Sequence, residues 1–170
     1  MNLSSVFSNV VHKQLVAVDL PNVASNQHEL NGVNALREFF GTSDTKRGSL
    51  SWHYFADDQE PVNENGEFTF YDARAKSSQA TRRSEWRFYY YGTFLIRADI
   101  GDWFFLALSK SGHLYGLVFQ NNSAWLRAAQ ILFGAQTTTP KFGAIGREAM
   151  EKQQLELVLF EAAERHHPHS

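Results

Sequence analysis

Short runs of aromatic and β-branched residues follow one another closely along this chain, and they constrain its fold more than any other feature. Turn-forming residues separate several of them, as Lys110-Ser111-Gly112 does between two apolar runs. Most of the gaps are too short for the crossover helices that a parallel α/β sheet requires. The runs that we predict as strands are residues 10–19, 50–55, 68–71, 86–91, 93–98, 103–109 and 113–119.

Two segments have apolar residues at helical spacing and are closed by glycine. These are residues 33–40, followed by Gly41, and residues 123–133, followed by Gly134. Residues 147–165 form a longer amphipathic pattern. The sequence therefore predicts a mainly β (α+β) domain: an open pseudobarrel of seven or eight strands with two short helices and a C-terminal helix. We expect this domain to occupy residues 1–135, with residues 136–170 as a linker and helix leading toward a further domain.

Composition excludes several classes of protein. The 170 residues include no cysteine, which excludes a disulfide scaffold, a thiol nucleophile and a cysteine-ligated zinc site. No stretch approaches the roughly 20 apolar residues of a membrane helix. The first residues lack the pattern of a signal peptide. The net charge of −2 gives no general attraction to nucleic acid, so such a partner has to be inferred from local charge.

One segment departs from that charge balance. Residues 74–87, RAKSSQATRRSEWR, hold five basic side chains and one acidic one. Such a segment can neutralise phosphates, and its arginines can bind guanine through two parallel hydrogen bonds. A solvated basic loop without a partner is the alternative. The candidate DNA-binding residues here are Arg74, Lys76, Ser78, Gln79, Arg82, Arg83, Glu85, Trp86 and Arg87.

A second polar segment, residues 26–32, is dense in amide and imidazole groups that can read base edges. Its alternative role is a loop that only caps the helix predicted over residues 33–40. If both polar segments lie on one rim of the barrel, they form a clamp for a duplex. The candidates in this segment are Asn26, Gln27, His28, Glu29 and Asn31.

Three patterns in the chain resemble a known family. The first is a strand that ends at residues 16–19 and is followed by the polar run 25–32. The second is Phe70-Tyr71-Asp72-Ala73-Arg74. The third is Thr81-Arg82-Arg83-Ser84-Glu85-Trp86-Arg87, which continues into an aromatic strand. Together they resemble the N-terminal DNA-binding (effector) domain of EcoRII-type restriction endonucleases.

The resemblance covers residues 6–135 and implies a DNA-binding pseudobarrel similar to the B-three domains of plant transcription factors. In that family two arms enter the major groove of duplex DNA. The arms would correspond here to residues 22–33, which include His28, and residues 73–87. Several members read the sequence CCWGG as monomers, which makes CCWGG a candidate target. A monomer in a prokaryotic cytoplasm, with no membrane association, is what this resemblance implies.

Individual positions of the second arm can also be compared with the family. Arg82, Glu85 and Arg87 fall at its charged positions, whereas Trp86 stands where the family pattern has a lysine. Glu85 has two possible roles: to accept a hydrogen bond from cytosine, or to hold an arginine in one rotamer.

The sequence contains no pattern for cutting DNA. No Glu-x-Lys occurs, and the one Asp-x-Lys, Asp44-Thr45-Lys46, lies in a polar loop where a nuclease strand is implausible. We therefore expect no catalytic residues, no metal site and no cofactor for DNA binding; Mg²⁺ would be needed only by an attached nuclease domain. An all-β carbohydrate- or peptide-binding domain is the alternative. A binder of single-stranded nucleic acid, using the aromatic residues of 89–91 and 103–105, is a third option.

Overall fold

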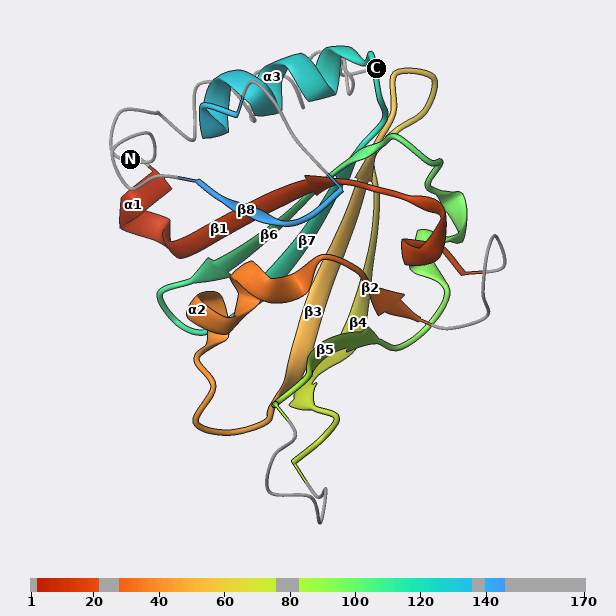
Figure 1. Ribbon diagram of the computed structural model, residues 1–170. Coiled ribbons are helices and arrows are strands. Elements are labelled where there is room, and N and C mark those ends of the chain that lie inside the picture. Colours follow the sequence, from red (N-terminus) through yellow and green to blue (C-terminus); the bar gives the residue numbers. More distant parts are fainter. Residues whose placement is uncertain (1–2, 22–27, 76–82, 136–139, 146–170) are drawn as a thin grey trace.

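One eight-stranded sheet, open and curled into a half-barrel, organises this chain (Figure 1). The computed structural model describes residues 3–21, 28–75, 83–135 and 140–145. The strand order is β2-β5-β4-β3-β7-β6-β1-β8, and all neighbours are antiparallel except β3 and β7, which are parallel. The strands are β1 (Phe7–Gln14), β2 (Glu29–Leu30), β3 (Lys46–Phe55), β4 (Val62–Asp72), β5 (Trp86–Tyr90), β6 (Trp103–Ser109), β7 (Leu114–Phe119) and β8 (Gly143–Ala144).

Both short helices that the sequence predicts are present. The first is the 3₁₀ turn η2 (Val33–Ala35) continued by α2 (Leu36–Phe40). The second is α3 (Ala124–Phe133). The Ser123 hydroxyl accepts a hydrogen bond from the backbone N–H of Leu126, and Gly134 closes the helix in the left-handed conformation. The remaining short elements are α1 (Leu3–Val6), η1 (Ala17–Asp19) and η3 (Phe94–Arg97).

The sheet is covered on both faces where β6 lies. Phe104 belongs to the core that contains the α2 residues, and Phe105 to the core under α3. Consecutive residues of a strand point to opposite faces, so α2 and α3 cover opposite sides of this strand. Burial on both faces explains why the β6 sequence WFFLALS is continuously apolar rather than alternating. The predicted mainly β pseudobarrel-like fold is confirmed.

The dipeptide Asn65-Gly66 is typical of hairpin turns, but here both residues lie inside β4. A Cβ atom at position 66 would lie 2.7 Å from Nε1 of Trp52, whose indole is fully buried. Gly116, on the other neighbouring strand, would place its Cβ 2.9 Å from the same indole. The glycines therefore make room for Trp52, and glycine at position 66 serves packing rather than a turn.

Two predicted strands need correction. Residues 93–98 contain the 3₁₀ turn η3 instead of a strand, and its Phe94 and Leu95 are buried. The first strand ends at Gln14 rather than at residue 19, because residues 17–19 fold into η1. A carboxylate oxygen of Asp19 accepts a hydrogen bond from the Val16 backbone, which fixes this turn.

Residues 140–145, inside the predicted linker, contribute to the sheet. Strand β8 pairs with β1, and Phe142 and Ile145 belong to the two cores. The division of the chain at residue 135 stays a prediction. The helix predicted over residues 147–165 lies outside the described residues.

Candidate nucleic-acid interface

The two polar segments leave the sheet from neighbouring strands. Strand β2 pairs with β5, so that Glu29 lies opposite Tyr89. Of the candidate residues, the structure describes His28, Glu29, Asn31, Arg74, Arg83, Glu85, Trp86 and Arg87. Asn26, Gln27, Lys76, Ser78, Gln79 and Arg82 lie outside the described residues.

Side chains of the two segments meet at this junction. The guanidinium of Arg87 lies 3.9 Å from the Glu29 carboxylate. The Tyr71 hydroxyl donates a hydrogen bond of 3.5 Å to the same carboxylate. Both segments also line a surface hollow of about 390 Å³, to which Asn31 and Trp86 contribute. In the part of the chain that the structure describes, the segments therefore lie side by side.

Glu85 is the centre of an exposed ion-pair cluster on the basic segment. One of its carboxylate oxygens accepts a hydrogen bond from Arg87 at 2.7 Å, and the other from Arg74 at 3.4 Å. The hydrogen bond from Arg87 lowers the pKa of Glu85, and Arg74 adds to this shift. All three side chains are about 40% exposed, at 38–43%. Glu85 thus holds two guanidinium groups that solvent or a ligand can still reach.

Asp72 fixes the backbone beneath that cluster. Its Oδ1 accepts hydrogen bonds from the backbone N–H groups of Arg74 (3.0 Å) and Glu85 (2.8 Å). The backbone N–H of Ala73 donates to the Glu85 carbonyl at 2.8 Å. The two ends of the basic segment are therefore held together where β4 ends and β5 begins.

The aromatic candidates in the two segments pack against the sheet. Trp86 is half-buried and stacks on Phe70, with ring centroids 5.0 Å apart. His28 stacks on Tyr90 at 5.3 Å, and its backbone carbonyl accepts a hydrogen bond from Tyr90. Its Nδ1 is buried and has no hydrogen-bond partner among the described residues. Arg83 is exposed.

A buried ion pair, which the sequence analysis missed, holds the base of the amide-rich segment. The ammonium of Lys13 and the carboxylate of Asp19 lie 2.7 Å apart, and both side chains are 0% exposed. Lys13 also donates to the Asn31 carbonyl at 2.8 Å, and Asp19 accepts from the Asn31 backbone N–H at 2.7 Å. Both backbone groups of Asn31 are thereby fixed. A lysine within the apolar run VVHKQLV was the available signal.

The environment of this pair completes its hydrogen bonds. The Tyr90 hydroxyl donates to the Asp19 carbonyl at 2.7 Å, and burial raises the pKa of Tyr90. Lys13 lies 5.5 Å from the centre of the Phe142 ring. Burial lowers the pKa of Lys13, whereas the charge of Asp19 and the hydrogen bond to it oppose that shift. Removing either residue of this buried pair would leave the charge of the other uncompensated, so the pair stabilises the fold only when both are present.

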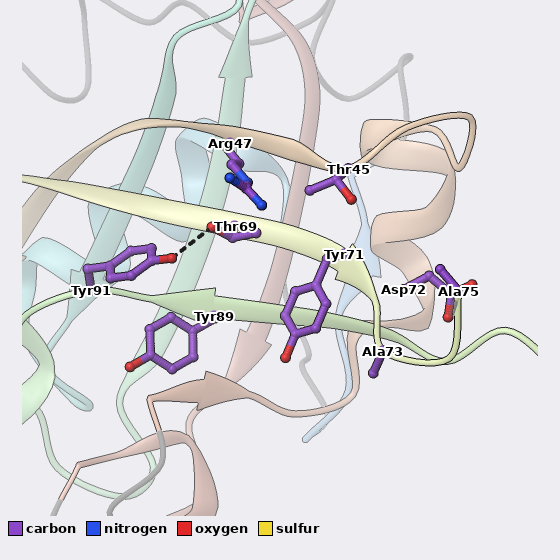
Figure 2. Close-up of a pocket in the computed structure, with 9 residues that line it drawn as sticks. All are labelled: Thr45, Arg47, Thr69, Tyr71, Asp72, Ala73, Ala75, Tyr89 and Tyr91. Atoms are coloured by element: carbon purple, nitrogen blue, oxygen red, sulfur yellow. Dashed lines mark hydrogen bonds between the residues drawn. The ribbon is translucent and has the colours of Figure 1, made fainter. Parts of the chain in front are cut away.

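A tyrosine-lined hollow lies on the outward face of β3, β4 and β5 (Figure 2). Its volume is about 560 Å³, and Arg47, Thr69 and Tyr89 occupy one row across the three strands. Strand alternation turns Tyr89 outward, whereas Tyr90 is fully buried.

Two features are absent from the described residues, a metal-binding cluster and a membrane-spanning helix. Within 3–21, 28–75, 83–135 and 140–145, no group of three or more His, Cys, Asp or Glu side chains could hold a metal ion. No helix in these ranges is long and apolar enough to cross a bilayer. The Ser51 hydroxyl and Nε2 of His113 lie 2.7 Å apart, but the hydrogen bonds of the described residues place no carboxylate on this histidine.

No family model matches this chain, and no curated protein matches it. The fold is pseudobarrel-like, and membership of the EcoRII-type family stays a prediction. Function is therefore inferred from the residues around β2, β4 and β5.

Proposed function

We propose that this chain is a sequence-specific recognition module for double-stranded DNA, of the kind that belongs to type II restriction endonucleases. It would bind a short site, with CCWGG as the candidate, from the major groove. It would act as a monomer, without metal or cofactor and without catalytic residues of its own. A nuclease domain elsewhere would supply cleavage and its Mg²⁺.

The observation that carries this proposal is the pairing of β2 with β5. It brings Glu29 and Arg87, 58 positions apart in the sequence, to within 3.9 Å of each other. The basic segment, with five cationic side chains in 14 residues, thus ends beside the amide-rich one. Cationic groups position a duplex through its phosphates, and amide, imidazole and guanidinium groups read base edges. Two such segments on one rim can address both tasks.

Each group has a distinct role in the proposal. Three arginines contact guanine edges or phosphates: Arg82, Arg83 and Arg87. Two further cations, Arg74 and Lys76, bind the phosphate backbone of the DNA. Glu85 holds Arg87 through a hydrogen bond of 2.7 Å, which orders a flexible side chain before DNA arrives. The remaining candidates, His28, Glu29 and Asn31, read bases from the other segment.

The decisive experiment is selection of binding sites from a random duplex library, followed by titration of the selected duplex with variants. Arg87→Ala should weaken binding by about 5- to 150-fold and relax the preference at one base pair, because one bidentate contact discriminates by about 1–3 kcal/mol. Arg127→Ala, which removes an exposed cation from α3, is the matched control and should bind like the wild type.

Two results would overturn the proposal. One is a selection that enriches no sequence. The other is unchanged duplex affinity in both Arg82→Ala and Arg87→Ala. Failure of the wild type to be retained on heparin at about 100 mM salt would favour the carbohydrate- or peptide-binding alternative.

A further inference from the structure

We propose that the tyrosine-lined hollow is a second ligand site, which takes an unpaired nucleotide by stacking its base on tyrosine and pairing its phosphate with Arg47. The inference does not rest on the duplex proposal, because the hollow lies on the outward face of β3–β5 and needs no base pair. Its volume of about 560 Å³ falls within the usual range of small-molecule sites. Figure 2 shows Tyr71 and Tyr89 projecting on the same side of β4 and β5.

The aromatic wall is arranged before any ligand binds. The rings of Tyr89 and Tyr91 meet edge to face, with centroids 4.9 Å apart. The Tyr91 and Thr69 hydroxyls share a hydrogen bond of 3.1 Å (Figure 2). His28 stacks on Tyr89 at 6.1 Å. Tyr91 nevertheless stays 48% exposed, which is unusual for a large aromatic side chain that only fills a core. Little side-chain freedom remains to be lost when a base stacks here.

Arg47 supplies the charge that a phosphate needs. It is exposed, lies in the same cross-strand row as Thr69 and Tyr89, and has no ion-pair partner among the described residues. Two nearby carboxylates have other partners: Asp72 accepts two backbone N–H groups, and Glu29 lies beside Arg87 and Tyr71. Glu67 lies one row further along the same face, opposite Ser49. Among the described residues no ion pair joins Arg47 to any of these three carboxylates, so its charge is available to a ligand.

The same wall could in principle stack on a sugar ring, but a nucleotide fits the whole set better. A planar base matches tyrosine faces regardless of its sequence, and stacking contributes strongly to single-strand binding. The hydroxyls of Thr45 and the tyrosines can hydrogen bond to base edges or ribose. A guanidinium beside an aromatic platform favours an anionic ligand over a neutral oligosaccharide.

The test is fluorescence anisotropy of a labelled single strand of six thymidines at low salt, with thymidine monophosphate as competitor. Tyr89→Ala should weaken binding by about 5- to 150-fold, because one base loses its stacking partner. Tyr89→Phe keeps the ring and should bind within about twofold of the wild type. Arg47→Ala, at an exposed position where folding is not at risk, should weaken binding and lower the salt dependence by about one phosphate contact.

Matched variants separate this inference from the duplex proposal. Arg47→Ala should leave affinity for the selected duplex unchanged, and Arg127→Ala should leave both ligands unaffected. Weaker single-strand binding in Arg47→Ala together with no duplex binding by the wild type would support this site and overturn the proposed function. Wild-type single-strand affinity in both Arg47→Ala and Tyr89→Ala would overturn the site. Displacement of the strand by a neutral oligosaccharide but not by thymidine monophosphate would overturn it as well.

Discussion

The molecule contains two carboxylate–cation groups that differ almost entirely in their surroundings. Lys13 and Asp19 are completely buried and 2.7 Å apart, and they are hydrogen-bonded to backbone groups of Val16 and Asn31. Glu85, with Arg74 and Arg87, has the same chemistry and includes a contact of the same length, but its members are about 40% exposed. Burial makes the first group a fixed part of the fold, whereas water leaves the second free to exchange partners.

The two groups therefore have different roles, each in one of the two polar segments. The buried pair fixes the backbone of Asn31, at the base of the amide-rich segment. The exposed cluster orders guanidinium groups that remain accessible to phosphates or bases. An exposed pair contributes little to stability, since water competes for both partners. Removing a member of the buried pair should therefore mainly lower the stability of the fold. Removing a member of the exposed cluster should mainly change DNA binding.

The largest effect is expected from Lys13→Met. The change leaves the Asp19 carboxylate buried without its counter-charge, which should lower the free energy of unfolding by about 3–5 kcal/mol. Urea denaturation followed by tryptophan fluorescence measures this loss. A cost below about 1 kcal/mol would show that the pair is not the buried anchor described above.

A smaller loss is expected when one neighbour of the buried pair changes. Tyr90→Phe removes the hydroxyl that donates to the Asp19 carbonyl at 2.7 Å. The buried carbonyl then lacks this partner, at a cost of about 1–3 kcal/mol in the free energy of unfolding. Tyr89→Phe is the control, because Tyr89 is only half-buried, and it should change stability by less than about 0.5 kcal/mol.

Glu85→Gln should separate stability from binding. The free energy of unfolding should change little, because the ion pairs are exposed and water competes for both partners. DNA binding should become less sequence-specific and more salt-dependent, since Arg74 and Arg87 are released to contact phosphates. Competition between selected and random duplex at several salt concentrations measures both effects. A specificity ratio equal to that of the wild type would contradict the assigned role of Glu85.

The smallest expected effect is the loss of the stabilising contribution of Glu85 at acidic pH. The pKa of Glu85 is lowered in the folded state, chiefly by the hydrogen bond from Arg87, from an ordinary value of 4.5. The unfolded state then binds more protons as the pH falls below 4.5, so the contribution of Glu85 is present above that value and is lost in acid. The stability difference between wild type and Glu85→Gln should shrink as the pH falls from 6 to 3. A difference that grows with acid would contradict the lowered pKa.

Local sequence patterns predicted which segments form strands and helices better than they predicted which strands pair with one another. Strand alternation, Ser123 and Gly134 correctly indicated β strands and helix α3, because each signal acts within a few residues. The two-residue strands β2 and β8 depend on distant neighbours and carry no pattern of their own. Asn65-Gly66 resembles a turn signal although it lies inside a strand, because the glycine is needed to make room for Trp52 on the adjacent strand.

The candidate site was predictable in composition but not in geometry. Charge density alone identified residues 74–87. The pairing that puts Glu29 beside Arg87 is a tertiary contact, as is the meeting of Lys13 with Asp19. The hollow beside Tyr89 needed the register of three strands before Arg47 and Thr69 could be placed in one row. These contacts and registers join segments that are separated in the sequence, so no local sequence pattern reveals them.

The place of β1 in the sheet has a consequence for synthesis on the ribosome. Its long neighbour is β6, whose residues 103–109 are made about 90 residues later. At typical elongation rates the strand therefore waits about 5–20 s before this partner emerges. During that interval its apolar side chains, Val10 and Val11 among them, are open to chaperones or to premature association. Slowing translation between β1 and β6 should thus lower the soluble yield more than slowing it after β7.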